Sequence, residues 1–99
     1  MMKVGGIYVS PLEVEAVLLH HPSVAEVAVV ARRDDAGLVK PCAFIVTADG
    51  AEADEKLGED LKSFVKTRLA PYKYPRWIEF VTSLPKTATG KIERYRLRS

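Results

Sequence analysis

Residues 85–91 read Pro-Lys-Thr-Ala-Thr-Gly-Lys, so two lysines, two hydroxyls and a glycine fall within one short segment. A glycine lets the backbone approach another group, hydroxyls exchange hydrogen bonds, and a lysine ammonium supplies a compact mobile charge. This combination predicts a loop that handles an anion. Taken alone, the segment also leaves open an incidental turn on the protein surface.

A nucleotide-binding P-loop is the first specific anion site to test against this segment. That motif requires G-x-x-x-x-G-K-[ST], in which the final hydroxyl binds magnesium. Pro85 stands where the first glycine is required, and Ile92 follows Lys91 in place of the hydroxyl. The segment is therefore not a P-loop.

Basic residues gather at the C-terminal end, although the whole chain carries a net charge of only +2. A charge of this size does not by itself predict nucleic-acid binding. The cluster leaves two interpretations open, a polyanion- or nucleic-acid-binding module and a solvated tail. Its members are Lys86, Lys91, Arg94, Arg96 and Arg98, set against one acid, Glu93.

The chain has 99 residues, of which 47% are hydrophobic and 28% charged, as expected for a single globular domain over residues 1–99. A domain of this length buries only about two thirds of its unfolded surface. It has room for one modest core but not for a deep substrate pocket. Any catalysis is therefore expected at an interface with something larger. The abrupt, glycine-rich beginning predicts a piece of a longer protein.

Three further features concern metals, thiols and membranes. The single cysteine, Cys42, cannot form an intramolecular disulfide, which fits a reducing cytoplasm. It lies in an apolar run and is predicted to fill the core. His20 and His21 have no cysteine or carboxylate at ligand spacing, so no metal site is expected. No signal peptide is visible and no apolar stretch approaches the ~20 residues that span a bilayer. We expect a cytoplasmic protein without a membrane partner.

The first half of the chain predicts a strand, a helix and a pair of strands. A short strand is expected over residues 3–9. Residues 10–13, Ser-Pro-Leu-Glu, predict a helix start with a capping box, and apolar residues on opposite sides predict a helix covered on more than one face. Residues 24–31 predict a buried strand, and residues 41–47 its antiparallel neighbour.

The second half begins with a clear amphipathic helix over residues 57–69, stopped by Pro71. Residues 76–81 alternate as a short strand, in which Trp77 is expected to pack rather than to bind a ligand. Residues 85–91 form a loop, and residues 92–97 predict a last helical turn. The predicted fold class is α+β, with helices packed on a small, mostly antiparallel sheet.

Three segments resemble the signature motifs of the adenylate-forming enzymes, the superfamily of acyl-CoA synthetases, peptide-synthetase adenylation domains and luciferases. Residues 5–15, Gly-Gly-Ile-Tyr-Val-Ser-Pro-Leu-Glu-Val-Glu, resemble the stretch that opens the C-terminal domain of these enzymes. Residues 69–75, Leu-Ala-Pro-Tyr-Lys-Tyr-Pro, and residues 84–92 resemble the second and the final signatures. The motifs stand in the family's order and cover most of the chain. Residues 5–11 look closest to benzoate-type CoA ligases.

The resemblance implies the mobile C-terminal domain of a two-step ligase. A carboxylate and ATP would form an acyl-adenylate and pyrophosphate, after which coenzyme A would displace AMP. Lys91 matches the family's adenylation lysine, which bridges the carboxylate and the α-phosphate. ATP, Mg²⁺, coenzyme A and the aromatic acid would bind mainly to an N-terminal domain, the partner of this one, so the fragment alone is expected to be inactive. Another acyl-CoA synthetase or an adenylation domain of different specificity is the alternative.

The resemblance also implies roles for other residues. After a domain rotation, Gly5 and Gly6 would line the channel for the pantetheine arm of coenzyme A. The hinge residue of the family would stand just before this stretch, so Lys3 is only an adjacent candidate. Residues expected to shape the catalytic loop or to touch phosphate are Lys86, Thr87, Thr89 and Gly90. Candidates for contacts with the large domain or with coenzyme A are Lys3, Lys73 and Arg76.

Overall fold

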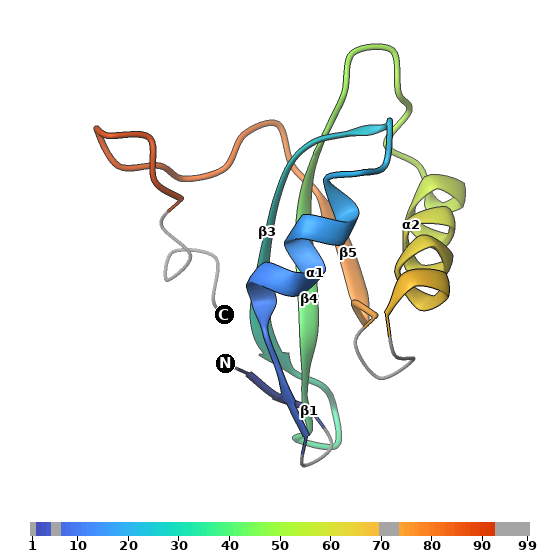
Figure 1. The fold of residues 1–99 in the computed structure, drawn as a ribbon, viewed down its shortest axis with the longest axis vertical. Coiled ribbons are helices and arrows are strands. Elements are labelled where there is room, and N and C mark those ends of the chain that lie inside the picture. Colours follow the sequence, from blue (N-terminus) through green and yellow to red (C-terminus); the bar gives the residue numbers. More distant parts are fainter. Residues whose placement is uncertain (1, 5–6, 70–73, 93–99) are drawn as a thin grey trace.

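The computed structural model describes residues 2–4, 7–69 and 74–92, with the side chains of residues 10–69 and 74–92. Two helices lie beside a small sheet in these parts of the chain (Figure 1), so the predicted α+β class is confirmed. None of the described helices is long and apolar enough to cross a membrane. In chain order the elements are β1 (Met2–Val4), β2 (Ile7–Val9), α1 (Pro11–Leu18), β3 (Val24–Arg33), β4 (Val39–Thr47), α2 (Glu55–Arg68) and β5 (Trp77–Phe80).

The central sheet has the strand order β3-β4-β5. β3 and β4 are antiparallel, as predicted, and Val30 lies opposite Cys42. β4 and β5 run parallel, and Cys42 also lies opposite Trp77. The sheet is therefore mixed, and β5 is the parallel exception to the predicted, mostly antiparallel pairing. The reason is α2, which connects β4 to β5 as a helical crossover and so returns the chain in its original direction.

The N-terminal segment forms two strands instead of the single one predicted over residues 3–9. β1 and β2 pair antiparallel, and Lys3 lies opposite Tyr8. Gly5 and Gly6 stand between the two strands and lie outside the described residues. The described residues on either side of the glycine pair therefore form an antiparallel strand pair rather than one continuous strand.

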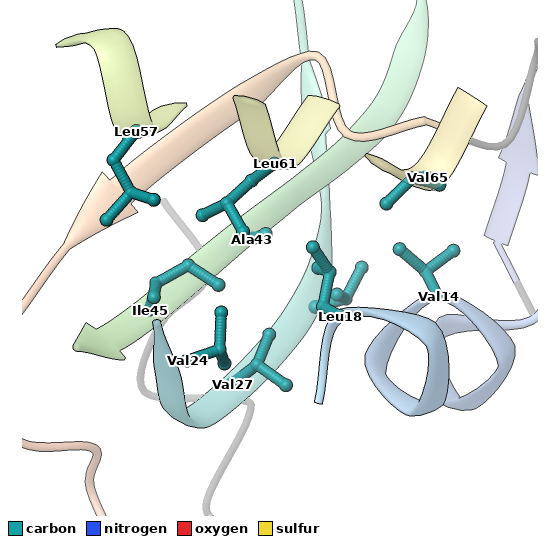
Figure 2. Packing of buried hydrophobic residues seen from close by; sticks show 10 residues of the cluster. Val14, Leu18, Val24, Val27, Ala43, Ile45, Leu57, Leu61 and Val65 are labelled. Carbon is teal, nitrogen blue, oxygen red and sulfur yellow. The ribbon is translucent and has the colours of Figure 1, made fainter. Parts of the chain in front are cut away.

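The main core lies between the two helices and one face of the sheet. α2 has the predicted apolar stripe, and the Asp54 carboxylate caps its start by accepting a hydrogen bond from the Leu57 amide at 2.8 Å. Figure 2 shows side chains from both helices meeting those of β3 and β4. The buried residues of this cluster are Val14, Leu18, Val24, Val27, Val29, Ala43, Ile45, Leu57, Leu61 and Val65.

The start and the outer side of α1 differ from prediction. Ser10 is the N-cap residue, but its side chain makes no capping hydrogen bond, so the predicted capping box is not formed by Ser10. Its carbonyl instead accepts hydrogen bonds from the amides of Glu13 and Val14. Leu12 and Leu19 are 64% and 50% exposed. A helix that lies on one sheet buries a single stripe of residues, so α1 does not have the second covered face that the sequence predicts.

The opposite face of the sheet carries a smaller apolar cluster, which the segment after β5 covers in place of a helix. Cys42 is fully buried here, so its predicted core role is confirmed, and burial raises the pKa of its thiol to about 11. Trp77 packs against this cluster, as predicted. The buried members are Ala28, Val30, Cys42, Phe44 and Leu84, and Val46, Trp77, Val81 and Ile92 pack against them.

Candidate functional site

Residues 87–91 form a tight turn that carries Lys91. The amide of Gly90 donates a hydrogen bond to the carbonyl of Thr87 at 3.0 Å, and the amide of Thr87 donates to the carbonyl of Lys91 at 2.8 Å. Gly90 has φ +88°, the left-handed conformation that other L-residues adopt only at a cost of roughly 1–2 kcal/mol. A three-residue loop that ends in a left-handed glycine is a common hairpin connection. The backbone therefore gives Lys91 a defined place.

The two threonines of the turn support it from within. The hydroxyl oxygen of Thr87 accepts a hydrogen bond from the Lys91 amide at 3.1 Å. The hydroxyl oxygens of Thr87 and Thr89 lie 2.9 Å apart and share a hydrogen bond. Both hydroxyls thus take part in hydrogen bonds within the turn, and Thr87 is the residue tied directly to Lys91.

A second turn of the domain, residues 34–38, repeats this arrangement with other residues. The Asp34 amide donates to the Leu38 carbonyl at 2.9 Å, and the Gly37 amide donates to the Asp34 carbonyl at 2.9 Å. The Asp34 carboxylate accepts a hydrogen bond from the Leu38 amide at 2.9 Å, as the Thr87 hydroxyl does from Lys91. In both turns the first side chain is a hydrogen-bond acceptor and a glycine follows three positions later. This short pattern explains why residues 87–91 fold locally.

The base of the turn is fixed to the second face of the sheet. Lys86 and Ile92 form an antiparallel β-bridge across the base. Ile92 packs against the second apolar cluster, and Leu84, two residues before Lys86, is buried in it. The ammonium of Lys86 forms an ion pair with the carboxylate of Glu26 on β3. Apolar packing and one ion pair thus connect the turn to the rigid sheet.

Lys91 itself is exposed and lies next to the base of this hairpin, directly before Ile92. Within the part of the chain that the structure describes, no hydrogen bond or ion pair joins its ammonium to another side chain. Its backbone is held on both sides while the charge is left available. Such a group can bring two anions together and offset their repulsion, because a cation placed in advance needs little reorganisation during the reaction.

Arg76 lies apart from this turn, at the start of β5. Its amide donates a hydrogen bond to the Pro41 carbonyl at 2.8 Å. Its exposed side chain lines a shallow hollow of about 280 Å³ with Asp34, Asp35, Ala36 and Trp77. Two carboxylates beside one guanidinium disfavour a phosphate in this hollow. A role for Arg76 toward coenzyme A or the large domain stays a prediction.

The remaining predicted residues lie beyond what the structure describes. Gly5, Gly6 and Lys73 fall outside the described residues, and only the backbone of Lys3 is described. Of the predicted helical turn over residues 92–97, Ile92 takes part in a β-bridge and the others lie outside the described residues.

Among described residues no group of three His, Cys, Asp or Glu side chains could hold a metal ion. His21 instead accepts a hydrogen bond from the Ser23 amide and contacts Phe64.

Sequence reasoning missed two acids that position these elements. Glu26 pairs with Lys86, and the buried Glu15 of α1 accepts a hydrogen bond from the Val29 amide of β3 at 2.7 Å. Glu26 interrupts the apolar run of residues 24–31, and a charge within a buried strand is a signal that it has a partner. Its partner could not be identified from the sequence because Lys86 lies far along the chain.

A comparison with protein families matches residues 13–91 to the model described as AMP-binding enzyme C-terminal domain. The chain is 63% identical over 99 residues to benzoate–CoA ligase of Thauera aromatica, covering 100% of this chain and 19% of that protein. It is 48% identical over 99 residues to 4-hydroxybenzoate–CoA/benzoate–CoA ligase of Rhodopseudomonas palustris, covering 99% of this chain and 18% of that protein.

Solved structures give the same result. A benzoate CoA ligase from Burkholderia xenovorans is 59% identical with a TM-score of 0.87, over 93% of this chain and 19% of that one. An anthranilate CoA ligase in complex with anthranoyl-AMP is 52% identical with a TM-score of 0.92, over 98% of this chain and 19% of that one. The chain thus spans about a fifth of the length of these relatives.

Proposed function

This chain belongs to the family of AMP-binding enzyme C-terminal domains, and from that premise we propose that it supplies Lys91 to the adenylation step of an aryl-acid–CoA ligase. In this reaction the carboxylate oxygen attacks the α-phosphorus of ATP, the bond to the β-phosphate oxygen breaks, and pyrophosphate leaves. Coenzyme A then displaces AMP through its thiol, which gives the thioester. The whole protein is thus an ATP-dependent acid–thiol ligase.

One observation carries the proposal: an exposed ammonium stands on a turn whose backbone is fixed from both sides. The carbonyl of Lys91 accepts a hydrogen bond from Thr87, and its amide donates one to the Thr87 hydroxyl. Between the carboxylate and the α-phosphate, the ammonium would reduce the repulsion of the two anions and stabilise the charge that develops on the phosphoryl oxygens. A flexible tail would lose more conformational entropy in reaching the same place.

The aromatic acid is proposed from the relatives. Benzoate and hydroxybenzoate are named in the two curated relatives described above, at 63% and 48% identity. The carboxylate pocket would lie on the large N-terminal domain, because a domain of 99 residues has room for one modest core but not for a deep substrate pocket. The similarity supports an aryl-acid ligase, and a different acyl specificity is the alternative.

The second half-reaction is assigned to another surface of the same domain. We place Gly5 and Gly6 beside the pantetheine arm after the domain has rotated against its N-terminal partner, since two glycines allow close passage of a chain. ATP and coenzyme A would bind mainly through that partner. Mg²⁺ would likewise be held mainly through that partner, since the described residues include no group of three His, Cys, Asp or Glu side chains that could hold a metal ion.

The test is a Lys91→Ala variant of the full-length protein, with each half-reaction measured separately. Adenylate formation, followed by isotope exchange between pyrophosphate and ATP, should fall about 10²–10³-fold, as is usual when one charge-stabilising group is lost. Thioester formation from supplied acyl-adenylate should remain within a few-fold of the unchanged protein.

Lys56→Ala is the matched control, because Lys56 is an exposed lysine on α2, away from the turn. It should leave both half-reactions unchanged. Equal damage to both half-reactions by Lys91→Ala would indicate misfolding or misplacement of the domain, and undiminished adenylation would remove Lys91 from the mechanism.

A polyanion-binding module was the alternative from another class, and nothing in the described residues favours it. Lys86, the first member of the basic cluster, is paired with Glu26. Arg94, Arg96 and Arg98 lie outside the described residues. Retention of the chain on DNA or RNA that depends on salt would support this alternative.

A further inference from the structure

Glu26 and Lys86 meet at the place where the Lys91 hairpin joins the sheet. Glu26 lies opposite Val46 in the β3–β4 ladder, next to a register shift between Val24 and Glu26. Val46 packs against the second apolar cluster. Because the two residues of a cross-strand pair point to the same side of a sheet, Glu26 projects toward the face that the segment after β5 covers. Its carboxylate there pairs with Lys86.

Lys86 and Ile92 are bridge partners, and Ile92 directly follows Lys91. Both legs of the hairpin are thus held at the sheet, one by apolar packing of Ile92 and the other by the ion pair of Lys86. Without the ion pair, the backbone segment at Lys86 could rotate about the point where Ile92 packs against the second apolar cluster. Such a rotation would move Lys91, because its backbone is hydrogen-bonded to Thr87, the neighbour of Lys86.

We propose that Glu26 and Lys86 are positioning residues for Lys91, and that Lys86 does not bind phosphate. This inference rests on the proposed role of Lys91 in adenylation. The carboxylate of Glu26 satisfies the charge of Lys86 and would repel a phosphate at the same place. The two ammonium groups of the loop therefore have different roles, since Lys86 fixes the hairpin and Lys91 meets the reactants.

The experiment swaps the charges of Glu26 and Lys86 in the full-length protein. Lys86→Met and Glu26→Gln should each lower the turnover of adenylation about two- to fivefold, the range that a partly exposed ion pair can influence, with an unchanged KM for ATP. Lys86→Glu and Glu26→Lys should each do more damage, because each places like charges together. The double variant Glu26→Lys/Lys86→Glu should recover to within about twofold of the unchanged protein.

Glu59 and Lys62 on α2 provide a matched control pair, with a side-chain N···O distance of 3.6 Å. Exchanging the charges of this pair should leave adenylation unchanged, because it has no connection to the hairpin. A second measurement does not depend on activity. Hydrogen–deuterium exchange of a peptide over residues 86–92 should speed up in both neutral variants and return to its original rate in the double variant.

The outcomes separate this inference from the proposed function. A raised KM for ATP in Lys86→Met, with a silent Glu26→Gln, would show Lys86 to be a phosphate contact and would overturn the inference. Failure of the double variant to recover either measurement would also overturn it. Lys91→Ala could leave adenylation intact while hydrogen–deuterium exchange of residues 86–92 still speeds up in the neutral variants and returns to its original rate in the double variant. In that case the proposed function would be wrong, and Glu26 and Lys86 would only stabilise the hairpin.

Discussion

Gly90 and Gly37 adopt the same left-handed conformation, φ +88° and φ +81°, at equivalent positions of two turns. An added Cβ would meet no atom within 4 Å at either glycine. A substitution by alanine therefore costs only backbone energy, about 1–2 kcal/mol at each position. One turn carries Lys91 and the other does not, so the pair separates an effect on stability from an effect on the reaction.

Gly90→Ala should lower adenylation in the full-length protein about tenfold, since strain of about 1.4 kcal/mol in the active position corresponds to that factor. Gly37→Ala should lower the free energy of unfolding by about 1–2 kcal/mol, the same backbone cost as at Gly90, and leave adenylation unchanged. Pyrophosphate exchange and thermal unfolding measure the two effects. Equal loss of rate in both variants would contradict a specific role for the Gly90 turn.

Thr87→Val removes the hydroxyl that accepts the hydrogen bond of the Lys91 amide and keeps the branched shape of the side chain. A hydrogen bond contributes about 1 kcal/mol, so adenylation should fall about fivefold, while thioester formation from acyl-adenylate should persist. Thr87→Ser should recover most of the rate because it keeps the oxygen.

Thr67→Val is the control for this change, because Thr67 donates to the Phe64 carbonyl on the exposed side of α2. It should not alter adenylation. If Thr87→Val and Thr87→Ser were equally impaired, the methyl group or the fold would matter rather than the hydrogen bond.

Features encoded within a few neighbouring residues could be predicted from the sequence. The stripe of α2, the buried strand β3 and the turn before Lys91 each depend on local periodicity or on a glycine at a fixed position. The proposed role of Lys91 rests on the resemblance of the motifs to a family. The structure adds that Gly90 and Thr87 hold the turn.

Features that depend on distant parts of the chain could not be predicted. β5 is parallel to β4 because α2 crosses between them, and no residue of β5 itself encodes that direction. The capping box at Ser10 failed although its sequence pattern is present, because the pattern permits the hydrogen bond without requiring it. The pairing of Glu26 with Lys86 arises only when the segment after β5 folds across the sheet.

Glu15→Ala should destabilise the 99-residue chain. Its carboxylate accepts a hydrogen bond from the Val29 amide on β3, an edge strand of the central sheet, and Glu15 is only 7% exposed. Without the acceptor this buried amide loses its partner, which costs about 1–3 kcal/mol. Urea unfolding should show a lower midpoint with an unchanged slope. Glu52→Ala, at an exposed acid before α2, should change the free energy of unfolding by no more than about 0.5 kcal/mol, and an equal effect of the two would contradict this role of Glu15.

Cys42 should make the stability of the domain depend on pH, because burial raises the pKa of its thiol from 9.0 to about 11. Between these two values the unfolded chain loses the thiol proton before the folded chain does, so Cys42 makes stability fall as the pH rises through that window. Unfolding midpoints should therefore decrease more steeply between about pH 9 and pH 11 for the unchanged protein than for Cys42→Ala.

The same shift predicts slow chemistry at this thiol. At pH 8 the folded protein should react with iodoacetamide about a hundredfold more slowly than the urea-unfolded chain, because two pKa units reduce the thiolate fraction by that factor and burial limits access further. Mass spectrometry of the alkylated protein measures both rates. Rapid labelling of the folded protein would show that the face of the sheet beneath Leu84 and Ile92 opens readily, which would also contradict a firmly anchored Lys91 hairpin.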